Sequence, residues 1–211
     1  RGLFSQKANE ASIKLASERG VFPNYDKSIY ACTASQRYRN ASRTTVAPTG
    51  TVSIIAGCSG GIEPLFAVAY KRNVLVEEGL SEAHPLFVEI AKKRGFYSPK
   101  LLEEISKEGS LQNMRDVPPD VKKLFVTAHD VSPEQHVRIQ AACQRHIDSG
   151  VSKTINFPKN ATIDDVRNVF FLAYKSGCKG ITIYRDQSRV SQALSLACGC
   201  AKNAATPGEQ R

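Results

Sequence analysis

The order of elements along the chain predicts an α/β fold with parallel strands. The last third alternates helix, strand, helix and strand, at residues 133–148, 152–158, 162–174 and 179–184. Strands joined through a helix run parallel in one sheet. Earlier in the chain, the β-branched run Thr44–Val46 turns at Pro48 into another apolar segment. A barrel and a doubly wound sheet both remain open, and ligands bind at the carboxyl ends of the strands in either fold.

The composition is that of a soluble globular protein. The chain has 211 residues, of which 41% are hydrophobic and 23% are charged, so it can bury one substantial core. No stretch approaches the roughly 20 apolar residues of a membrane span. Residues 1–20 are typical of a polar amphipathic helix and not of a signal peptide. We therefore expect a cytoplasmic protein without a membrane partner.

The N-terminal residues resemble the interior of a domain. The chain begins with Arg1 and not with methionine, so we expect a fragment of a longer polypeptide, with a processed or trimmed chain as the alternative. A helix is predicted over Ser5–Arg19, ended by Gly20. Residues 21–35 are predicted to form a loop.

The stretch from Thr44 to Gly57 predicts a strand, a tight turn and the start of a helix. The first N–H groups of a helix have no partner within it and lie at the positive end of its dipole, so they suit a phosphate. Gly50 allows close approach of a ligand, and the nearby hydroxyls can cap the helix or donate to phosphate oxygens. The predicted phosphate-binding residues are Pro48, Thr49, Gly50, Thr51, Val52 and Ser53. The alternative is an ordinary strand–helix corner, which the residues by themselves favour slightly.

A glycine pair and an acidic residue follow this turn. Gly60-Gly61 permits an unusual backbone conformation, and Glu63 is held extended by Pro64. Glu63 is either a loop or helix-end partner or a site residue, and the two interpretations have equal weight. A strand is predicted over residues 67–76.

The middle of the chain is more polar. Residues 77–120 predict a peripheral helical insertion that contains no candidate site residues, with helices at 85–94 and 99–107. Residues 120–128 are also predicted to be helical. Ser132 and Pro133 then mark the start of the helix at 133–148.

The histidines predict no metal site. His136 and His146 lie too far apart on one helix to bind the same ion. We interpret these residues, with His84 and His129, as polar groups at the surface or at the edge of the core.

Charge and cysteine content leave two weaker signals. The net charge of +9 suits polyanions such as nucleotides or nucleic acid, although the densest basic groups lie on predicted helices, where a solvated face is favoured. Cys198 and Cys200 lie close together in a tail of small residues. Two neighbouring exposed thiols suggest redox or metal chemistry, with ragged sequence beside a truncation as the alternative.

Six short segments follow one another in a specific order. Residues 39–42 read RNAS, residues 47–57 read APTGTVSIIAG and residues 61–64 read GIEP. These three resemble consecutive motifs in the catalytic subunit of ribonucleotide reductases. Three further segments resemble the cobalamin-dependent branch of that family, namely LFVTA at 124–128, SKTINFP at 152–158 and GCKGITIYRD at 177–186.

The resemblance covers about residues 5–189 and carries several implications. It implies the C-terminal portion of a ten-stranded α/β barrel over residues 1–189, followed by a flexible cysteine-containing tail at 190–211. It implies reduction of ribonucleotides, expected to be diphosphates, to deoxyribonucleotides for DNA synthesis, with adenosylcobalamin as the source of the radical. In the family, the segment that matches Pro48–Ser53 binds the substrate phosphates, so the resemblance favours the phosphate-binding interpretation over the ordinary corner.

The chain also departs from the family pattern. The family's radical-bearing cysteine lies in an N-x-C-x-E motif that this sequence lacks, so catalytic residues are expected upstream of Arg1 and none is predicted here. We expect the chain to be inactive alone and to need the missing N-terminal part. The resemblance implies that Cys198 and Cys200 form a redox shuttle that accepts electrons from a thioredoxin- or glutaredoxin-type reductant. The resemblance allows the whole enzyme to be a homodimer but does not require it.

Two alternatives differ from this hypothesis. The first is the iron-dependent branch of the same family, whose members carry a radical-relaying tyrosine pair on the strand that matches Lys179–Arg185. Here Thr182 and Ile183 precede the single Tyr184, so the relay is missing and this alternative is disfavoured. The other alternative is a basic nucleotide- or nucleic-acid-binding module without redox activity. The absence of an aromatic-rich basic strand counts against it.

Overall fold

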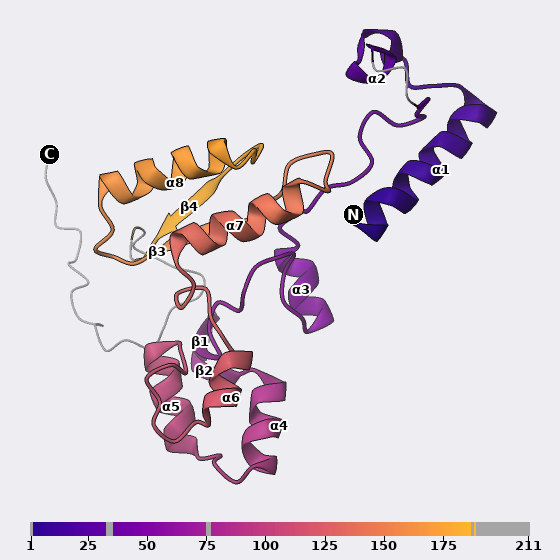
Figure 1. Ribbon diagram of the computed structural model, residues 1–211. Helices are drawn as coiled ribbons and strands as arrows, with labels where there is room; N and C mark the ends of the chain where they lie inside the picture. The colour runs from indigo at the N-terminus through magenta and orange to yellow at the C-terminus, as the bar shows by residue number, and fades with distance from the viewer. Residues whose placement is uncertain (1, 33–35, 75–76, 187, 189–211) are drawn as a thin grey trace, which may run out of the picture. The chain divides into compact units, whose positions relative to one another are not determined.

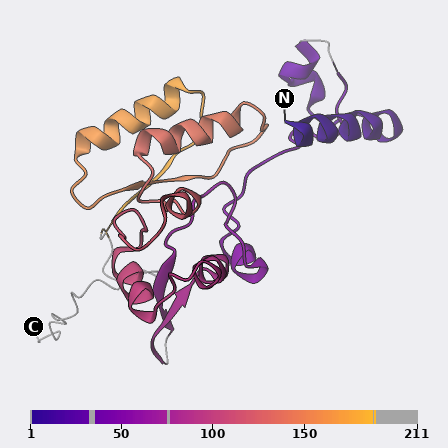
Figure 2. The same ribbon diagram turned by 60° about the horizontal axis from the view of Figure 1, so that its bottom comes forward.

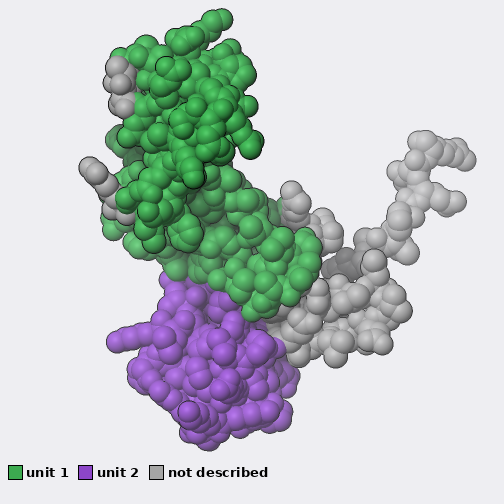
Figure 3. Space-filling view, turned by 90° about the vertical axis from the view of Figure 1, so that its right-hand side faces the viewer, with its two compact units in different colours: residues 1–64, 131–188 green, residues 65–130, 189–211 purple. Residues whose placement is uncertain are grey.

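The computed structural model describes residues 2–32, 36–74, 77–186 and 188 (Figure 1). The chain divides into two compact units, coloured separately in Figure 3. Unit 1 contains residues 1–64 and 131–188, and the described part of unit 2 is residues 65–130. Unit 1 is therefore built from two stretches of chain that unit 2 separates in sequence.

The first helix, α1 (Leu3–Arg19), ends at Gly20 as predicted. Gly20 has a φ of 76°, a left-handed conformation that glycine adopts readily. The following segment, predicted as a loop, contains the 3₁₀ turn η1 (Tyr25–Lys27) and the short helix α2 (Ile29–Cys32). Edge-to-face packing of aromatic rings orders this segment, and no local sequence pattern reveals it. The rings are those of Phe22, Tyr25, Tyr30 and Tyr38.

The second stretch of unit 1 confirms the predicted parallel strands. It forms, in order, α7 (Pro133–Gln144), β3 (Thr154–Phe157), α8 (Ile163–Lys175) and β4 (Thr182–Arg185). β3 and β4 pair in parallel, with Thr154 opposite Thr182 and Phe157 opposite Arg185. The helix α8 connects them, so these elements form a βαβ unit.

Both helices of this unit begin at side-chain caps. The hydroxyl of Ser132 accepts from the N–H of Gln135 at the start of α7, as the sequence predicts. α7 ends at Gln144, earlier than predicted, because the amide of Gln144 donates to the carbonyls of Ile147 and Ser149 and so stabilises a turn there. α8 begins at a complete capping box between Thr162 and Asp165.

The core of unit 1 lies on one face of these strands. Ile155 and Phe157 are buried, whereas Thr154 and Asn156 between them are partly exposed, which is the alternation of a strand with one covered face. Figure 2 shows α7 and α8 lying side by side. The buried cluster consists of Val137, Ile155, Phe157, Val169 and Ala173.

A third segment runs parallel to this pair. Val46 forms a parallel bridge with Val151, and its carbonyl accepts from the N–H of Ser152 at 2.9 Å. The strand predicted at 44–46 is therefore reduced to a single bridge. The chain then enters α3 (Gly50–Ala56), which confirms the predicted strand–turn–helix order.

Unit 2 combines an antiparallel hairpin with helices. Its elements are β1 (Ala69–Val74), β2 (Glu77–Ala83), α4 (Pro85–Lys93), α5 (Pro99–Glu108) and α6 (Pro119–Leu124). Gly95 and Gly109 follow α4 and α5 with φ angles of 77° and 75°. Its core contains Val68, Ala69, Phe87, Leu101, Ile105, Leu111, Met114, Val117, Val121 and Phe125.

Two predictions for unit 2 need correction. Residues 77–83 were expected to be helical as the start of the insertion at 77–120, but they form β2, which pairs with β1. Their polar sequence lacks the alternation that would indicate a strand, so the pairing partner determines the structure. α6 ends at Leu124 and not at Ala128, because Thr127 bridges to Leu65 and the N–H of Ala128 donates to the Leu65 carbonyl at 2.7 Å.

Within the described ranges, no helix combines the length and the apolar composition that crossing a bilayer requires.

Candidate functional site

The predicted phosphate turn is a sharp reversal between the Val46 bridge and α3. Thr49 has a φ of 51°, which is unusual for a residue with a side chain and turns the backbone toward the helix. The N–H of Ser53 donates to the Thr49 carbonyl at 2.8 Å, which is the first hydrogen bond of the helix. The N–H groups of residues 50–52 precede that bond and are therefore directed out of the helix start.

The turn is open to a ligand. Residues 48–52 are exposed, and Ser53 is partly buried, with its hydroxyl donating to the Gly50 carbonyl at 2.7 Å. A Cβ atom built at Gly50 meets nothing within 4 Å, so this backbone can be approached closely. Pro48, Thr49, Gly50, Thr51, Val52 and Ser53 thus form one exposed strand–helix corner with accessible backbone donors.

A second bend, at Gly60 and Gly61, crosses directly over this turn. A Cβ at Gly60 would lie 3.1 Å from the Pro48 carbonyl oxygen and 3.3 Å from Ser53 Oγ. Gly61 has a φ of 54°, and a Cβ there would lie 3.0 Å from the Ala47 carbonyl oxygen. A side chain at either position would crowd these carbonyl oxygens, and the positive φ of Gly61 is one that glycine adopts readily.

Glu63 follows this bend and is bound to the start of β3. Its Oε2 lies 2.5 Å from Nζ of Lys153, and its Oε1 accepts from the N–H of Thr154 at 2.5 Å. The Lys153 side chain is 0% exposed and that of Glu63 is 28% exposed. Of the two interpretations of Glu63, the structure supports the loop partner.

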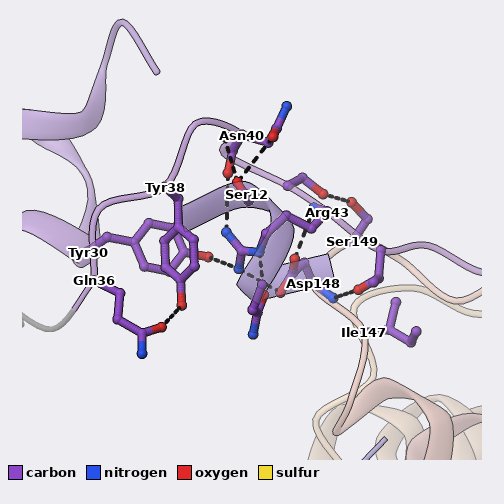
Figure 4. A network of polar contacts seen from close by, with 12 residues as sticks. Ser12, Tyr30, Gln36, Tyr38, Asn40, Arg43, Ile147, Asp148 and Ser149 are labelled. Carbon is purple, nitrogen blue, oxygen red and sulfur yellow. Dashed lines mark hydrogen bonds and ion pairs between the residues drawn. The ribbon is translucent and has the colours of Figure 1, made fainter. Parts of the chain in front are cut away.

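Arg43 forms a second polar centre, just before the Val46 bridge (Figure 4). Its guanidinium is 5% exposed and lies 3.1 Å from Asp148 Oδ1, and Nε donates to Asn9 Oδ1 at 2.6 Å. The same group stacks on Tyr38 at 4.0 Å and on Tyr30 at 5.2 Å from the ring centroids. These contacts connect α1, the aromatic segment and the loop after α7.

Sequence reasoning missed Arg43, Asp148 and Lys153. A weak signal existed for Lys153, because a lysine between Val151 and Ile155 falls on the buried side of a strand. Its partner, Glu63, lies 90 positions away, and a single sequence does not reveal such a pairing.

The cysteines and histidines add little chemistry to this site. Cys178 packs against the core of unit 1, and burial raises the pKa of its thiol, which makes it less reactive. His136, expected at the surface or at the edge of the core, is fully buried on α7. Cys198 and Cys200 lie outside the described residues.

The comparisons with known proteins agree on one family. A family model described as the barrel domain of ribonucleotide reductase matches residues 33–184. The vitamin B12-dependent ribonucleoside-diphosphate reductase of Mycobacterium tuberculosis (strain H37Rv) is 46% identical over 194 residues, which cover 92% of this chain and 27% of that protein. The protein of the same name from Thermoplasma acidophilum is 46% identical over 192 residues, covering 91% and 25%. The chain thus spans about a quarter of the length of these relatives.

A solved structure shares the fold. The Actinobacillus ureae class Id ribonucleotide reductase alpha subunit aligns with a TM-score of 0.67 and 24% identity, over 87% of this chain and 32% of that one. This likeness confirms that the mixed helices and strands are part of the expected α/β barrel.

Proposed function

The chain belongs to the ribonucleotide reductase family, and from this membership we propose that it is the substrate-phosphate-binding part of a vitamin B12-dependent ribonucleoside-diphosphate reductase. The whole enzyme would make deoxyribonucleotides for DNA synthesis in the cytoplasm. Support for the branch comes from the two relatives of that name at 46% identity over most of this chain.

The observation that carries the proposal is the exposed corner at residues 48–53. A diphosphate is a dense anion with several acceptor oxygens, and the N–H groups of residues 50–52 precede the first hydrogen bond of α3. The hydroxyls of Thr49 and Thr51 extend the set of donors. Fixing the phosphates at this corner would orient the ribose toward the reacting groups, and such positioning contributes several kcal/mol to catalysis.

The radical chemistry is assigned to the rest of the enzyme. Adenosylcobalamin, when bound to the whole protein, supplies the radical that begins the reduction. In the described part of this chain, no group of three or more His, Cys, Asp or Glu side chains could hold a metal ion, and we assign no residue to the cofactor. The role of this chain's own residues is to bind and orient the substrate.

The whole enzyme would need partners in addition to this chain. We propose that the N-terminal part of the same polypeptide carries the reactive cysteines, so that residues 1–211 alone are inactive. Cys198 and Cys200 would then pass electrons from a thioredoxin- or glutaredoxin-type protein to the active site. Assembly as a homodimer is compatible with this division of roles.

Steady-state kinetics of the full-length protein tests the phosphate assignment. Gly50→Val places a branched side chain where the phosphate would approach, and Thr51→Ala removes one hydroxyl. We expect Gly50→Val to raise KM for the ribonucleoside diphosphate about 10- to 100-fold, as expected for losing charge-assisted hydrogen bonds. Thr51→Ala should give a smaller rise.

Gly180→Val is the matched control. A Cβ at Gly180, like one at Gly50, meets no protein atom within 4 Å, so neither variant should disturb the fold of this chain. Gly180 lies before β4 and is not one of the proposed phosphate-binding residues, so its variant should keep the wild-type KM. Unchanged KM in both Gly50→Val and Thr51→Ala would refute the phosphate assignment.

A further inference from the structure

We propose that Glu63 and Lys153 act as a positioning pair that fixes the phosphate turn, an inference that rests on the proposed function. It starts from the contact between the two bends. The backbone at Gly60 and Gly61 passes so close to Ala47 and Pro48 that a Cβ atom at either glycine would crowd their carbonyl oxygens, so the second bend forms one side of the turn. Any displacement of the second bend would therefore be transmitted to the backbone that is proposed to hold the phosphates.

The ion pair determines where the second bend lies. The N–H of Glu63 donates to the Gly60 carbonyl at 3.0 Å, which fixes the Glu63 backbone to the bend. Both carboxylate oxygens are occupied, one by Nζ of Lys153 and the other by the N–H of Thr154. With both oxygens engaged, the side chain has one orientation relative to the strand.

The same strand also holds the other side of the turn. The Val46 carbonyl accepts from the N–H of Ser152, one position before Lys153. Residues 151–154 thus bind both the segment that enters the turn and the bend that crosses it. The turn is held between two attachments to one short piece of backbone.

The chemistry of the pair favours a positioning role over a stabilising one. A buried ion pair contributes little net stability compared with apolar residues of similar size, because both charges lose their hydration. Lys153 is completely buried, so its charge is retained at a cost. The ion pair fixes a direction and a distance between the two backbones, which an apolar contact does not do.

The experiment compares KM and thermal stability in the full-length protein. Lys153→Met leaves the Glu63 carboxylate without its ammonium partner, and the double variant Glu63→Gln/Lys153→Met removes both charges at similar volume. We expect Lys153→Met to raise KM for the ribonucleoside diphosphate at least 10-fold and to lower Tm. In the double variant Tm should recover while KM stays at least fivefold above wild type.

A purely structural role gives a different result. KM would then return to the wild-type value together with Tm in the double variant, and this outcome would overturn the inference. If Lys153→Met does not fold, Glu63→Gln decides the question, because it keeps an acceptor for the Thr154 N–H. A KM raised at least threefold at unchanged Tm supports the positioning role, and an unchanged KM overturns it.

Two sets of controls separate this inference from the proposed function. Asp120→Asn breaks the exposed pair between Asp120 and Arg94 in unit 2, and it should change neither KM nor Tm. If Gly50→Val raises KM while the Glu63 and Lys153 variants do not, the positioning pair alone is refuted. If Gly50→Val and Thr51→Ala also leave KM unchanged, the phosphate assignment fails and the inference fails with it.

Discussion

At the scale of single residues, Arg43 connects parts of unit 1 that lie far apart in the sequence. Its nearly buried guanidinium joins Asn9 of α1, Asp148 after α7 and the rings of Tyr30 and Tyr38. Its own N–H also donates to Asp148 Oδ2 at 3.0 Å. Because Arg43 lies three residues before the Val46 bridge, it fixes the approach of the chain to the turn.

Arg43→Leu should therefore loosen this approach locally. The substitution leaves Asp148 without its cationic partner, and breaking a buried pair in this way costs about 3 kcal/mol. Amide hydrogens at residues 44–46 should exchange about 100-fold faster in the full-length protein, as measured by mass spectrometry of the corresponding peptide. Arg167→Leu, which removes the exposed Arg167–Asp164 pair, is the control and should leave that exchange unchanged. Equal exchange in wild type and Arg43→Leu would contradict this role.

At the scale of elements, α8 carries the clearest pH-dependent feature. The backbone N–H of Thr162, followed by its hydroxyl, lowers the pKa of the exposed Asp165 carboxyl. A carboxyl whose pKa is lowered in the folded state stabilises the helix above its unfolded pKa. That contribution is lost as the pH falls through the lowered value.

A peptide of residues 160–177 tests the capping box by circular dichroism. At pH 7, Asp165→Asn should reduce the helix content, because the amide is a weaker acceptor than the carboxylate. As the pH falls through the lowered pKa of Asp165, its carboxyl becomes protonated, so the difference between wild type and Asp165→Asn should shrink. Asp164→Asn makes the same charge change in the first turn without touching the box, and it should have a smaller effect at pH 7. Equal losses in both variants would assign the effect to the helix dipole instead.

Elements marked by local chemistry could be predicted from the sequence, and those formed by distant partners could not. α7 and α8 begin at Ser132 and Thr162 because capping depends on neighbouring residues. The strand β2 was missed because its pairing with β1, and not its polar composition, makes it a strand. The turn at residues 48–53 was predictable because Pro, Gly and hydroxyl residues act locally. The Glu63–Lys153 pair depends on tertiary contact, which the sequence pattern does not encode.

At the scale of the whole molecule, unit 2 has the form of an inserted domain. Its first and last segments lie together, because Leu65 bridges to Thr127 and accepts a hydrogen bond from Ala128. It also has a hydrophobic core of its own. Many domains of about 60 residues fold alone when they bury such a core.

We expect residues 65–130 to fold in isolation. The segment should show helical circular dichroism and one cooperative thermal transition. Ile105→Ala should destabilise it by about 2–5 kcal/mol, because this side chain is fully buried and leaves a cavity. Lys100→Ala changes a side chain that is 85% exposed on the same helix, and it should leave Tm nearly unchanged. A gradual transition insensitive to Ile105→Ala would show that the unit depends on the rest of the protein.

The bridge between Val46 and Val151 also sets an order of events during biosynthesis. Thr45 and Gly150, which bond beside this bridge, are 105 positions apart, and unit 2 is translated between them. At roughly 5–20 residues per second, a ribosome needs on the order of 5–20 s to deliver the second partner after the first. During that interval residues 44–46 lack the partner at residues 150–152, and this edge of the nascent chain is open to association with other chains. Substitutions that slow the collapse of unit 2 should therefore reduce the yield of soluble protein while leaving the kinetics of the molecules that do mature unchanged.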